Sequence, residues 1–263
     1  MGVVNVTPDS FSDGGEAFGV EAGLRHALAL AEAGADVLDI GGESTRPGAS
    51  AVSAEEEIAR VCPLIAALAR ETDRPISIDT LKPQVARAAV AAGARMWNDV
   101  NGLRGVGALA TAAELGCDVV IMHMQGAPQT MQAKPHYEDV VAEVAAFLTA
   151  RAEAALAAGV AREAIWLDPG LGFGKTLAHN LALLAALPRF TGLGFPCLLG
   201  ASRKRFIAAI DGADPEPRQR LGGSLAAAIT AAEAGFAMVR VHDVAETRQA
   251  LQVWAAIAQA REQ

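Results

Sequence analysis

Short runs of β-branched and other apolar residues alternate along the chain with longer segments whose pattern is helical. This alternation is typical of α/β folds with a parallel sheet. The predicted strands are Val3–Val6, Val37–Ile40, Ile76–Ile78, Met96–Val100, Val119–His123, Ile165–Leu167, Cys197–Leu199 and Met238–Val241. The predicted helices are Val20–Ala33, Ala54–Glu71, Gln84–Ala92, Ala108–Leu115, Val140–Ala158, Asn180–Ala186, Gly223–Ala234 and Ala245–Ala260. Eight such units predict a single α/β domain over residues 1–263, a closed (β/α)8 TIM barrel, with an open doubly wound sheet as the alternative.

Long loops rich in Gly, Asp, Asn, Ser and Pro follow several of the predicted strands. Thr7–Gly19 and Gly41–Val52 come after the first and second strands, and Gln125–Pro135 and Pro169–Thr176 come later. Barrel enzymes build their sites from the loops at the C-terminal ends of the strands. We therefore expect the function to lie at this end of the barrel.

The composition excludes several other classes of protein. Charged residues or glycines interrupt each apolar run before it reaches the roughly 20 residues of a membrane span. The net charge of −8 disfavours nucleic acid and anionic membranes as partners. The first residues lack the pattern of an export signal, which predicts a cytoplasmic protein. Cys62, Cys117 and Cys197 lie far apart, so neither a disulfide framework nor a zinc site is expected.

Polar residues stand at the ends of all the predicted strands. They are Asn5, the run Glu43–Arg46, Asp79, Asn98 with Asp99, His123, Asp168, Ser202 with Lys204, and Arg240 with His242. A lone Asp after a strand is more often a helix cap than a ligand-binding group. A ring of acids and amides around one lysine is instead suited to the donor-rich edge of a planar heterocycle, because a carboxylate accepts two parallel N–H bonds.

Arg240 and His242 are two residues apart on the last predicted strand, so their side chains share one face. Barrels of this kind commonly hold a phosphate near the loops after their last two strands. This predicts an anionic, phosphorylated substrate. The alternative is that Arg240 pairs with Asp243 or Glu246 at the surface.

The glycine-rich stretch Gly170–Thr176 superficially resembles a phosphate-binding loop. Gly170 and Gly174 enclose three residues where that motif needs four, and Pro169 takes the place of its first glycine. We therefore expect no nucleoside triphosphate site here.

Eight segments together resemble the dihydropteroate synthase family in order and spacing. They are Asn5–Gly15, Asp39–Gly48, Ser77–Thr80, Asn98–Val100, Met122–Met124, Asp168–Lys175, Ser202–Lys204 and Arg240–Asp243. The resemblance covers almost the whole chain. It implies a TIM barrel that condenses dihydropterin pyrophosphate with para-aminobenzoate, releases pyrophosphate and is a target of sulfonamides. It also implies a homodimer with Mg²⁺ as cofactor. Family members usually carry a segment before the strand that contains Asn5, whereas this sequence starts at Met1.

The resemblance also implies a role for individual residues. The pterin pocket would consist of Asp79, Asn98, Met122, Asp168 and Lys204. The diphosphate would be held by Asn5, Thr45, Arg240 and His242, with Asn5 also the ligand of Mg²⁺. The aminobenzoate pocket would consist of Phe11, Arg46, Pro47, Phe173 and Ser202.

The implied mechanism is dissociative: pyrophosphate leaves first, and the resulting pterin methyl cation is captured by the arylamine. The residues expected to stabilise charge are Lys204, Arg240, His242, Asp79 and the loop residue Asp13. His123 is expected to be packed or hydrogen-bonded near the end of its strand, without a catalytic role.

Two other readings of the same barrel remain. A pterin-dependent methyltransferase would transfer a methyl group to a corrinoid, but diphosphate and aminobenzoate binding together account for Thr45–Pro47 and Arg240–His242. A pterin-binding pseudo-enzyme would act as a partner subunit, yet the polar residues that catalysis requires are present in this sequence.

Overall fold

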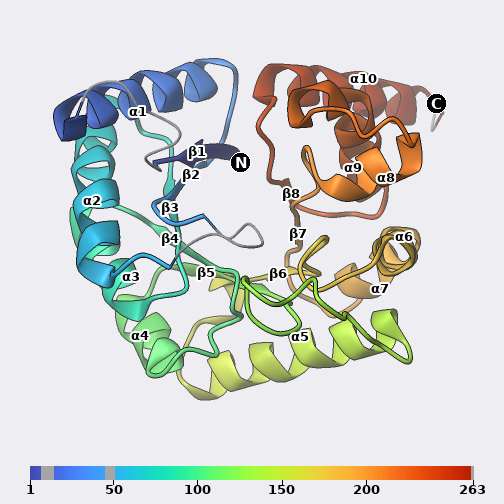
Figure 1. The fold of residues 1–263 in the computed structure, drawn as a ribbon, viewed down its shortest axis with the longest axis horizontal. Helices are drawn as coiled ribbons and strands as arrows, with labels where there is room; N and C mark the ends of the chain where they lie inside the picture. Colours follow the sequence, from blue (N-terminus) through green and yellow to red (C-terminus); the bar gives the residue numbers. More distant parts are fainter. Residues whose placement is uncertain (7–14, 45–50, 262–263) are drawn as a thin grey trace.

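The computed structural model describes residues 1–6, 15–44 and 51–261. Its strands are β1 Gly2–Asn5, β2 Leu38–Gly41, β3 Ile76–Asp79, β4 Met96–Asp99, β5 Asp118–Met122, β6 Ile165–Asp168, β7 Leu198–Leu199 and β8 Met238–Val239. The first six form one parallel sheet in sequence order, and β7 pairs in parallel with β8. Figure 1 shows the strands in the centre, surrounded by the helices.

Single parallel bridges join the two sheets into a ring. Leu167 on β6 pairs with Cys197, and Gly2 on β1 pairs with Val241. At the second junction Val3 N–H donates to Val241 O at 3.0 Å, and Val241 N–H donates to Met1 O at 2.9 Å. The predicted closed barrel is confirmed and the open sheet is wrong, because an open sheet would leave β1 and β8 at opposite edges.

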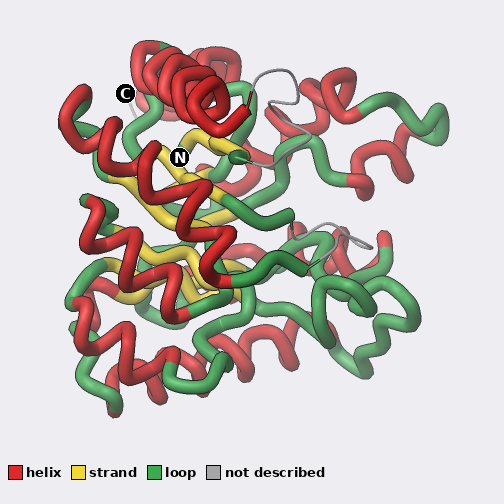
Figure 2. The backbone as a smooth tube through the Cα atoms, turned by 60° about the vertical axis from the view of Figure 1, so that its left-hand side comes forward, coloured by secondary structure: helices red, strands yellow, loops and turns green. Residues whose placement is uncertain are grey.

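The helices form the outer layer of the barrel (Figure 2). They are α1 Gly15–Glu32, α2 Ala54–Glu71, α3 Pro83–Ala92, α4 Ala108–Leu115, α5 Val140–Ala157, α6 Leu177–Ala185, α7 Leu187–Thr191, α8 Arg205–Asp211, α9 Leu221–Glu233 and α10 Val244–Arg261. Two single turns of 3₁₀ helix, η2 Arg162–Ala164 and η3 Pro217–Arg220, precede β6 and α9. The short helices α7 and α8 were not predicted, because one or two turns are too short to show a hydrophobic period.

Helix α2 illustrates how the sequence forms the outer layer. Ser53 Oγ accepts the N–H of Glu56 at 3.1 Å and caps the helix, and acidic residues fill its first turn. Its apolar positions Val61, Leu64 and Leu68 recur at helical spacing and are fully buried. The helix therefore packs this stripe against the barrel, and equivalent stripes of the other helices contribute to the same core.

The barrel interior differs between its two ends. Met1, Val37, Met96, Val120 and Leu198 fill the end where the strands begin with an apolar layer. Polar residues occupy the end where the strands finish, where Asp39, Asn98 and Asp168 are buried. This polar end, which we call the mouth, is where the sequence predicts the site.

The last two strands are shorter than predicted. Arg240 and His242 lie beyond β8, although Arg240 N–H still donates to Leu199 O at 3.0 Å and continues the barrel wall. Within the described part of the chain, no helix is long and apolar enough to cross a membrane.

Candidate active site

Strand register brings the predicted polar residues to one level. Asn5 pairs with Gly41, Gly41 with Asp79, and Asp79 with Asn98 across four neighbouring strands. A side chain on Gly41 would lie 3.7 Å from both Asn5 Oδ1 and Asp79 Cβ. Because Gly41 has no side chain, the volume that a Cβ would fill beside these two polar groups stays free.

The opposite wall of the mouth holds Asp168 and Lys204. A Cβ placed on Gly200 would lie 3.7 Å from Asp168 Oδ2 and 3.8 Å from Lys204 Nζ. A carboxylate and an ammonium group thus face each other above a second glycine. Neither glycine carries a side chain that would fill the space beside these polar groups.

Arg240 makes ion pairs with two carboxylates on β2 and β3. Its Nε donates to Asp39 Oδ2 at 2.6 Å, and its Nη2 donates to Asp79 Oδ2 at 2.7 Å. Asn98 Nδ2 also donates to Asp39 Oδ2, at 3.3 Å. The alternative pairing with Asp243 or Glu246 is wrong, because Arg240 points into the barrel and Asp243 binds Arg203 instead.

Asp39 was not assigned a role from the sequence, although a signal was present. It is an acid between Leu38 and Ile40 in a buried strand, and alternation places it on the face opposite those two side chains. Its carboxylate is fully buried. Such a residue requires a cationic partner, and the structure identifies that partner as Arg240.

Burial and neighbouring charges shift the pKa values of the ionisable side chains in the mouth. Burial raises the pKa of Asp79 to about 7, although the charge of Arg240 opposes the shift. Burial alone would lower the pKa of Arg240, but the carboxylates of Asp39 and Asp79 outweigh it and raise that pKa. Asp39 Oδ1 and Asp79 Oδ1 are buried without a hydrogen-bond donor among the described residues. Two carboxylate oxygens in the mouth can therefore accept hydrogen bonds from a ligand.

Asp168 and Lys204 are held by the loop between β6 and α6. Asp168 Oδ1 accepts the N–H of Gly170 at 2.7 Å, and burial raises the pKa of this carboxyl group. Lys204 Nζ donates to Leu171 O and lies 4.6 Å from the centre of the Phe173 ring. Burial lowers the pKa of Lys204 to about 8. The lysine is thus held beside the carboxylate and against an aromatic face.

The remaining predicted site residues that the structure describes are Ser202, His242 and Met122. Ser202 Oγ and His242 Nδ1 are 3.0 Å apart, and the backbone N–H of His242 donates to Ser202 Oγ at 3.2 Å. Met122 is 3% exposed, pairs in register with Asp168 and packs in an apolar cluster against Phe173. The cluster forms an apolar wall next to the Asp168 side of the mouth.

Three residues of the predicted polar ring make contacts outside the mouth: Asp99, Glu43 and His123. Asp99 accepts the N–H groups of Asn101 and Leu103 at 2.7 and 2.8 Å, so it shapes the loop after β4. Glu43 accepts from Lys82 Nζ at 2.6 Å and from Val52 N–H at 3.0 Å. These contacts are the common structural use of a strand-end acid.

His123 is the third ring residue with contacts outside the mouth. Its ring lies edge-on to Phe147, with centroids 4.8 Å apart, and its Nδ1 is 2.9 Å from Lys175 Nζ. Burial lowers the pKa of His123 to about 3, so the ring is neutral and accepts from the lysine. It is packed and hydrogen-bonded, as the sequence predicts.

Five predicted site residues lie outside the described residues: Phe11, Asp13, Thr45, Arg46 and Pro47. Among the residues that are described, no group of three or more His, Cys, Asp or Glu side chains is arranged to hold a metal ion.

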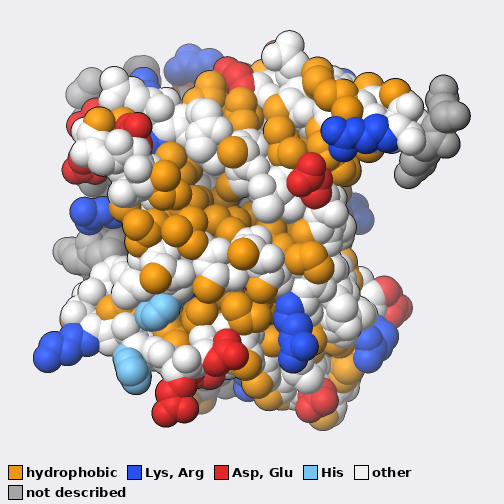
Figure 3. Space-filling view, turned by 90° about the vertical axis from the view of Figure 1, so that its right-hand side faces the viewer, with side chains coloured by type: hydrophobic (Ala, Val, Ile, Leu, Met, Phe, Trp, Pro, Cys, Tyr) orange, Lys and Arg blue, Asp and Glu red, His pale blue; other side chains and the backbone are white. Residues whose placement is uncertain are grey.

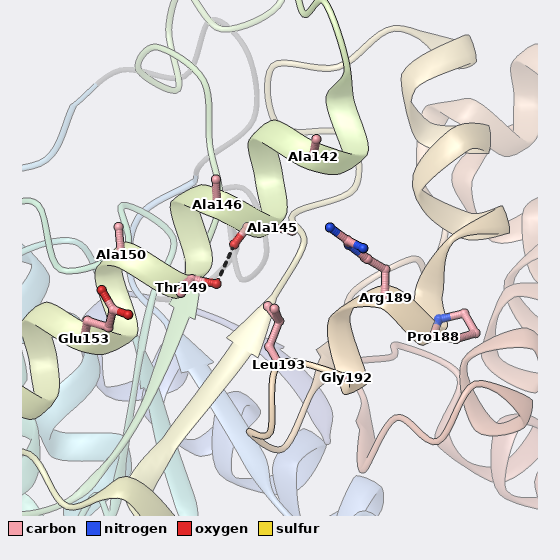
Figure 4. Close-up of a pocket in the computed structure, with 10 residues that line it drawn as sticks. All are labelled: Ala142, Ala145, Ala146, Thr149, Ala150, Glu153, Pro188, Arg189, Gly192 and Leu193. Carbon is pink, nitrogen blue, oxygen red and sulfur yellow. Dashed lines mark hydrogen bonds between the residues drawn. The ribbon is translucent and has the colours of Figure 1, made fainter.

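Two grooves lie on the helical exterior, away from the mouth. One, of about 620 Å³, is lined by alanines of α5 and by Pro188, Arg189 and Leu193 (Figure 4). The other, of about 660 Å³, lies between α9 and α10, where Val253 and Ile257 are exposed. Figure 3 shows hydrophobic side chains spread over the face that lies on the right-hand side of Figure 1.

The sequence matches the family described as "Pterin binding enzyme" over residues 1–242. It is 48% identical to the dihydropteroate synthase of Escherichia coli K12 over 262 residues, covering 100% of this chain and 92% of that one. It superimposes on the Xanthomonas albilineans dihydropteroate synthase with 4-aminobenzoic acid at a TM-score of 0.92, with 56% identity and coverage of 98% and 92%.

A second structure of the Xanthomonas albilineans enzyme, in complex with 7,8-dihydropteroate, gives a TM-score of 0.89 with 53% identity and the same coverage, 98% and 92%. These similarities extend over nearly the whole length of both chains and include the strands that carry the mouth. The chain therefore belongs to the pterin-binding enzyme family, as one of its dihydropteroate synthases.

Proposed function

We propose that this transferase condenses 6-hydroxymethyl-7,8-dihydropterin pyrophosphate with para-aminobenzoate, giving 7,8-dihydropteroate and pyrophosphate in folate synthesis. The similar enzyme of Xanthomonas albilineans holds 4-aminobenzoic acid in one structure and 7,8-dihydropteroate in another, which supports one of the two substrates and the product. The observation that carries the proposal is a pair of carboxylates on opposite walls of the mouth, the partly buried Asp79 and the buried Asp168. A pterin offers several N–H donors along one edge, and such acceptors would bind them.

The pterin would bind between these walls. Asp79, Asn98 and Asp168 would read its polar edge, Lys204 would donate to its ring acceptors, and Met122 would contact its face. The pKa of Asp79, raised to about 7, lets this group accept or donate a proton near neutral pH. Burial keeps water from competing for the same hydrogen bonds.

The diphosphate would lie toward Arg240 and His242, where cationic and N–H donors converge beyond β8. Pyrophosphate departure breaks the bond between the pterin methylene carbon and the phosphate oxygen. The arylamine nitrogen of para-aminobenzoate then forms a bond with that carbon and loses a proton. Arg240 would stabilise the leaving group, and the carboxylate of Asp79, with Asp13, would stabilise the developing pterin cation.

Mg²⁺ belongs to this proposal as a cofactor that neutralises charge on the diphosphate when it is bound. Mg²⁺ is usually held by one or two protein oxygens together with substrate phosphates and water. Asn5 Oδ1, beside Asp79 across Gly41, is an oxygen donor of the required kind. The side chain of Asn5 would hold the ion at the diphosphate end of the mouth, with Thr45 contributing to the same phosphate contacts.

The aminobenzoate would bind above Phe173 and Ser202, with Phe11, Arg46 and Pro47 completing its pocket. Two other predictions accompany the proposal. The homodimer stays a prediction, supported by the exposed apolar side chains of α10, and sedimentation of the full chain tests it. The cytoplasmic location also stays a prediction.

The deciding experiment mixes the protein with dihydropterin pyrophosphate, Mg²⁺ and para-aminobenzoate and measures pyrophosphate and dihydropteroate. We expect both products in equal amounts, and neither without the arylamine beyond slow hydrolysis. Pterin binding without either product would identify a pseudo-enzyme. Methyl transfer from a methylated pterin to a corrinoid, without pyrophosphate release, would identify a methyltransferase.

A further inference from the structure

Two charged residues in the motifs Ser202–Lys204 and Arg240–Asp243 have no part in the proposed substrate contacts. They are Arg203 and Asp243, and they bind each other. Arg203 Nε donates to Asp243 Oδ2 at 3.0 Å, and Arg203 Nη2 donates to Asp243 Oδ1. A two-pronged contact of this kind fixes orientation as well as distance.

The backbone of Arg203 is strained and held from both sides. Its φ of +60° is unusual for a residue other than glycine. Its N–H donates to Ser224 Oγ at 2.9 Å, and its carbonyl oxygen accepts from Arg220 Nη1 at 3.0 Å. The left-handed turn at Arg203 directs the neighbouring Ser202 and Lys204 toward the mouth while the side chain of Arg203 reaches Asp243.

Asp243 is held at the start of α10. Its carbonyl oxygen accepts the N–H of Thr247 at 3.0 Å and the hydroxyl of Thr247 at 2.7 Å. The residue before it is His242, whose Nδ1 lies 3.0 Å from Ser202 Oγ. The ion pair therefore joins two loops immediately beside the contact between Ser202 and His242.

We propose that Arg203 and Asp243 are positioning residues for the reaction: their ion pair sets the geometry between Ser202 on one loop and His242 on the other. This proposal rests on the proposed function, in which Ser202 borders the aminobenzoate and His242 borders the diphosphate. The two substrates must be held in reacting geometry, and small displacements of such groups reduce the rate strongly.

The test uses Arg203→Met, Asp243→Asn and the double variant, with Arg203→Lys as a conservative variant that keeps the charge but not the fork. The matched control is Arg87→Met, which cuts the ion pair between Arg87 and Glu114 on the outer helices α3 and α4. For each full-length variant we would measure kcat and KM for both substrates, Tm, and the ¹⁵N NMR signal of the His242 ring.

We expect each single variant to lose about tenfold in kcat/KM, and the double variant to lose no more than the worse single variant, because coupled residues are not additive. Arg203→Lys should recover part of the loss. The His242 Nδ1 signal should move in the Arg203 and Asp243 variants and stay in place in Arg87→Met. Losses that multiply in the double variant would overturn the proposal, as would lowered Tm with an unmoved His242 signal.

The two proposals can fail separately. A wild-type chain that releases no pyrophosphate would disprove the proposed function, but the His242 signal would still show whether the ion pair sets the geometry of that ring. Conversely, a fully active wild-type chain whose variants keep wild-type kcat/KM and an unmoved His242 signal would disprove only the positioning role.

Discussion

Asp168 combines one internal hydrogen bond with one oxygen directed at the mouth. In Asp168→Asn the amide oxygen can keep the contact with Gly170 N–H, so the amino group would face the donors of the pterin. We expect pterin binding to weaken by roughly 1.5–3 kcal/mol, with an added cost for the unpaired donors. Calorimetry with a free pterin measures this change.

The control is Asp118→Asn, the same change at the first residue of β5, at the opposite end of the barrel. It should leave pterin affinity unaltered. If Asp168→Asn bound the pterin as tightly as the wild-type chain, with equal Tm, Asp168 would not belong to the pocket.

Arg240 pairs with Asp39 and Asp79 and, in the proposed function, also contacts the diphosphate. A substitution must separate these two roles. Removing Arg240 altogether would leave Asp39 and Asp79 buried without a counter-charge, at a cost of about 3–5 kcal/mol. Arg240→Lys keeps the positive charge but loses the planar guanidinium group that donates to both carboxylates. We expect kcat/KM to fall by about 10- to 150-fold, corresponding to roughly 1.5–3 kcal/mol, with a smaller loss of affinity for a pterin that lacks the diphosphate. Equal losses in both measurements would assign Arg240 to the pterin pocket instead.

Lys175 is a buried cation whose Nζ contacts the carbonyl oxygens of Gly170 and Phe173 at 2.9 and 3.0 Å. Burial, with a smaller effect of Lys204, lowers its pKa from 10.5 to about 7. Between these values the unfolded chain holds a proton that the folded chain has released. The free energy of unfolding should therefore rise with pH above about 7, by up to about 1.4 kcal/mol per pH unit.

Urea unfolding between about pH 7 and 9 measures this dependence. Lys175→Met should show a smaller rise than the wild-type chain, and the exposed control Lys134→Met should show the full rise. Because burial lowers the pKa of Lys204 as well, some of the rise should remain in Lys175→Met. An undiminished rise would mean that Lys175 keeps its proton in the folded chain.

Among the elements, the loop from β6 to α6 depends on one glycine. Gly170 has a φ of +68°, and a Cβ there would lie 1.9 Å from the carbonyl oxygen of His123. Gly107 has a similar φ of +77° but open space around it. Gly170→Ala should therefore lower the free energy of unfolding by roughly 1–3 kcal/mol more than Gly107→Ala, because the backbone clash adds to the same conformational strain.

Chemical denaturation of both variants makes the comparison. Gly170→Ala should also weaken turnover, since the same loop carries Phe173 and the carbonyl group that binds Lys204. Equal destabilisation by the two substitutions would show that the loop yields to the added methyl group.

For the whole molecule, closure of the barrel predicts one cooperative unfolding transition. β7 and β8 are two residues long, yet their interior side chains pack in one layer with Met1, Val37 and Met96 from the other strands. Trp97 on β4 and Trp254 on α10 report on opposite parts of the ring. Variants that retain only one of these tryptophans should give the same midpoint in guanidinium chloride. Two separate midpoints would mean that α8 to α10 unfold as a unit of their own.

The alternation of strands and helices was sufficient to predict the barrel, because most of the strands are buried on both faces and the helices pack apolar stripes against them. It also predicted that Asp79, Asn98 and Asp168 would stand at the same end, since the strands are parallel. Elements shorter than two turns, such as α7, escaped prediction because they bury too little to leave a periodic pattern.

The partners of individual polar groups were decided only by the tertiary structure. Arg240 lies 201 residues from Asp39, and its three nearest acids in sequence are not the ones it binds. The same holds for Arg203, whose carboxylate partner is 40 residues away. Sequence patterns determine which face of an element is buried and at which end of the barrel a residue lies. The pairing of individual charges depends on the register of the strands and on closure of the ring. Ion pairs and hydrogen bonds form only between groups a few ångströms apart, and the separation of two residues in the sequence does not predict that distance.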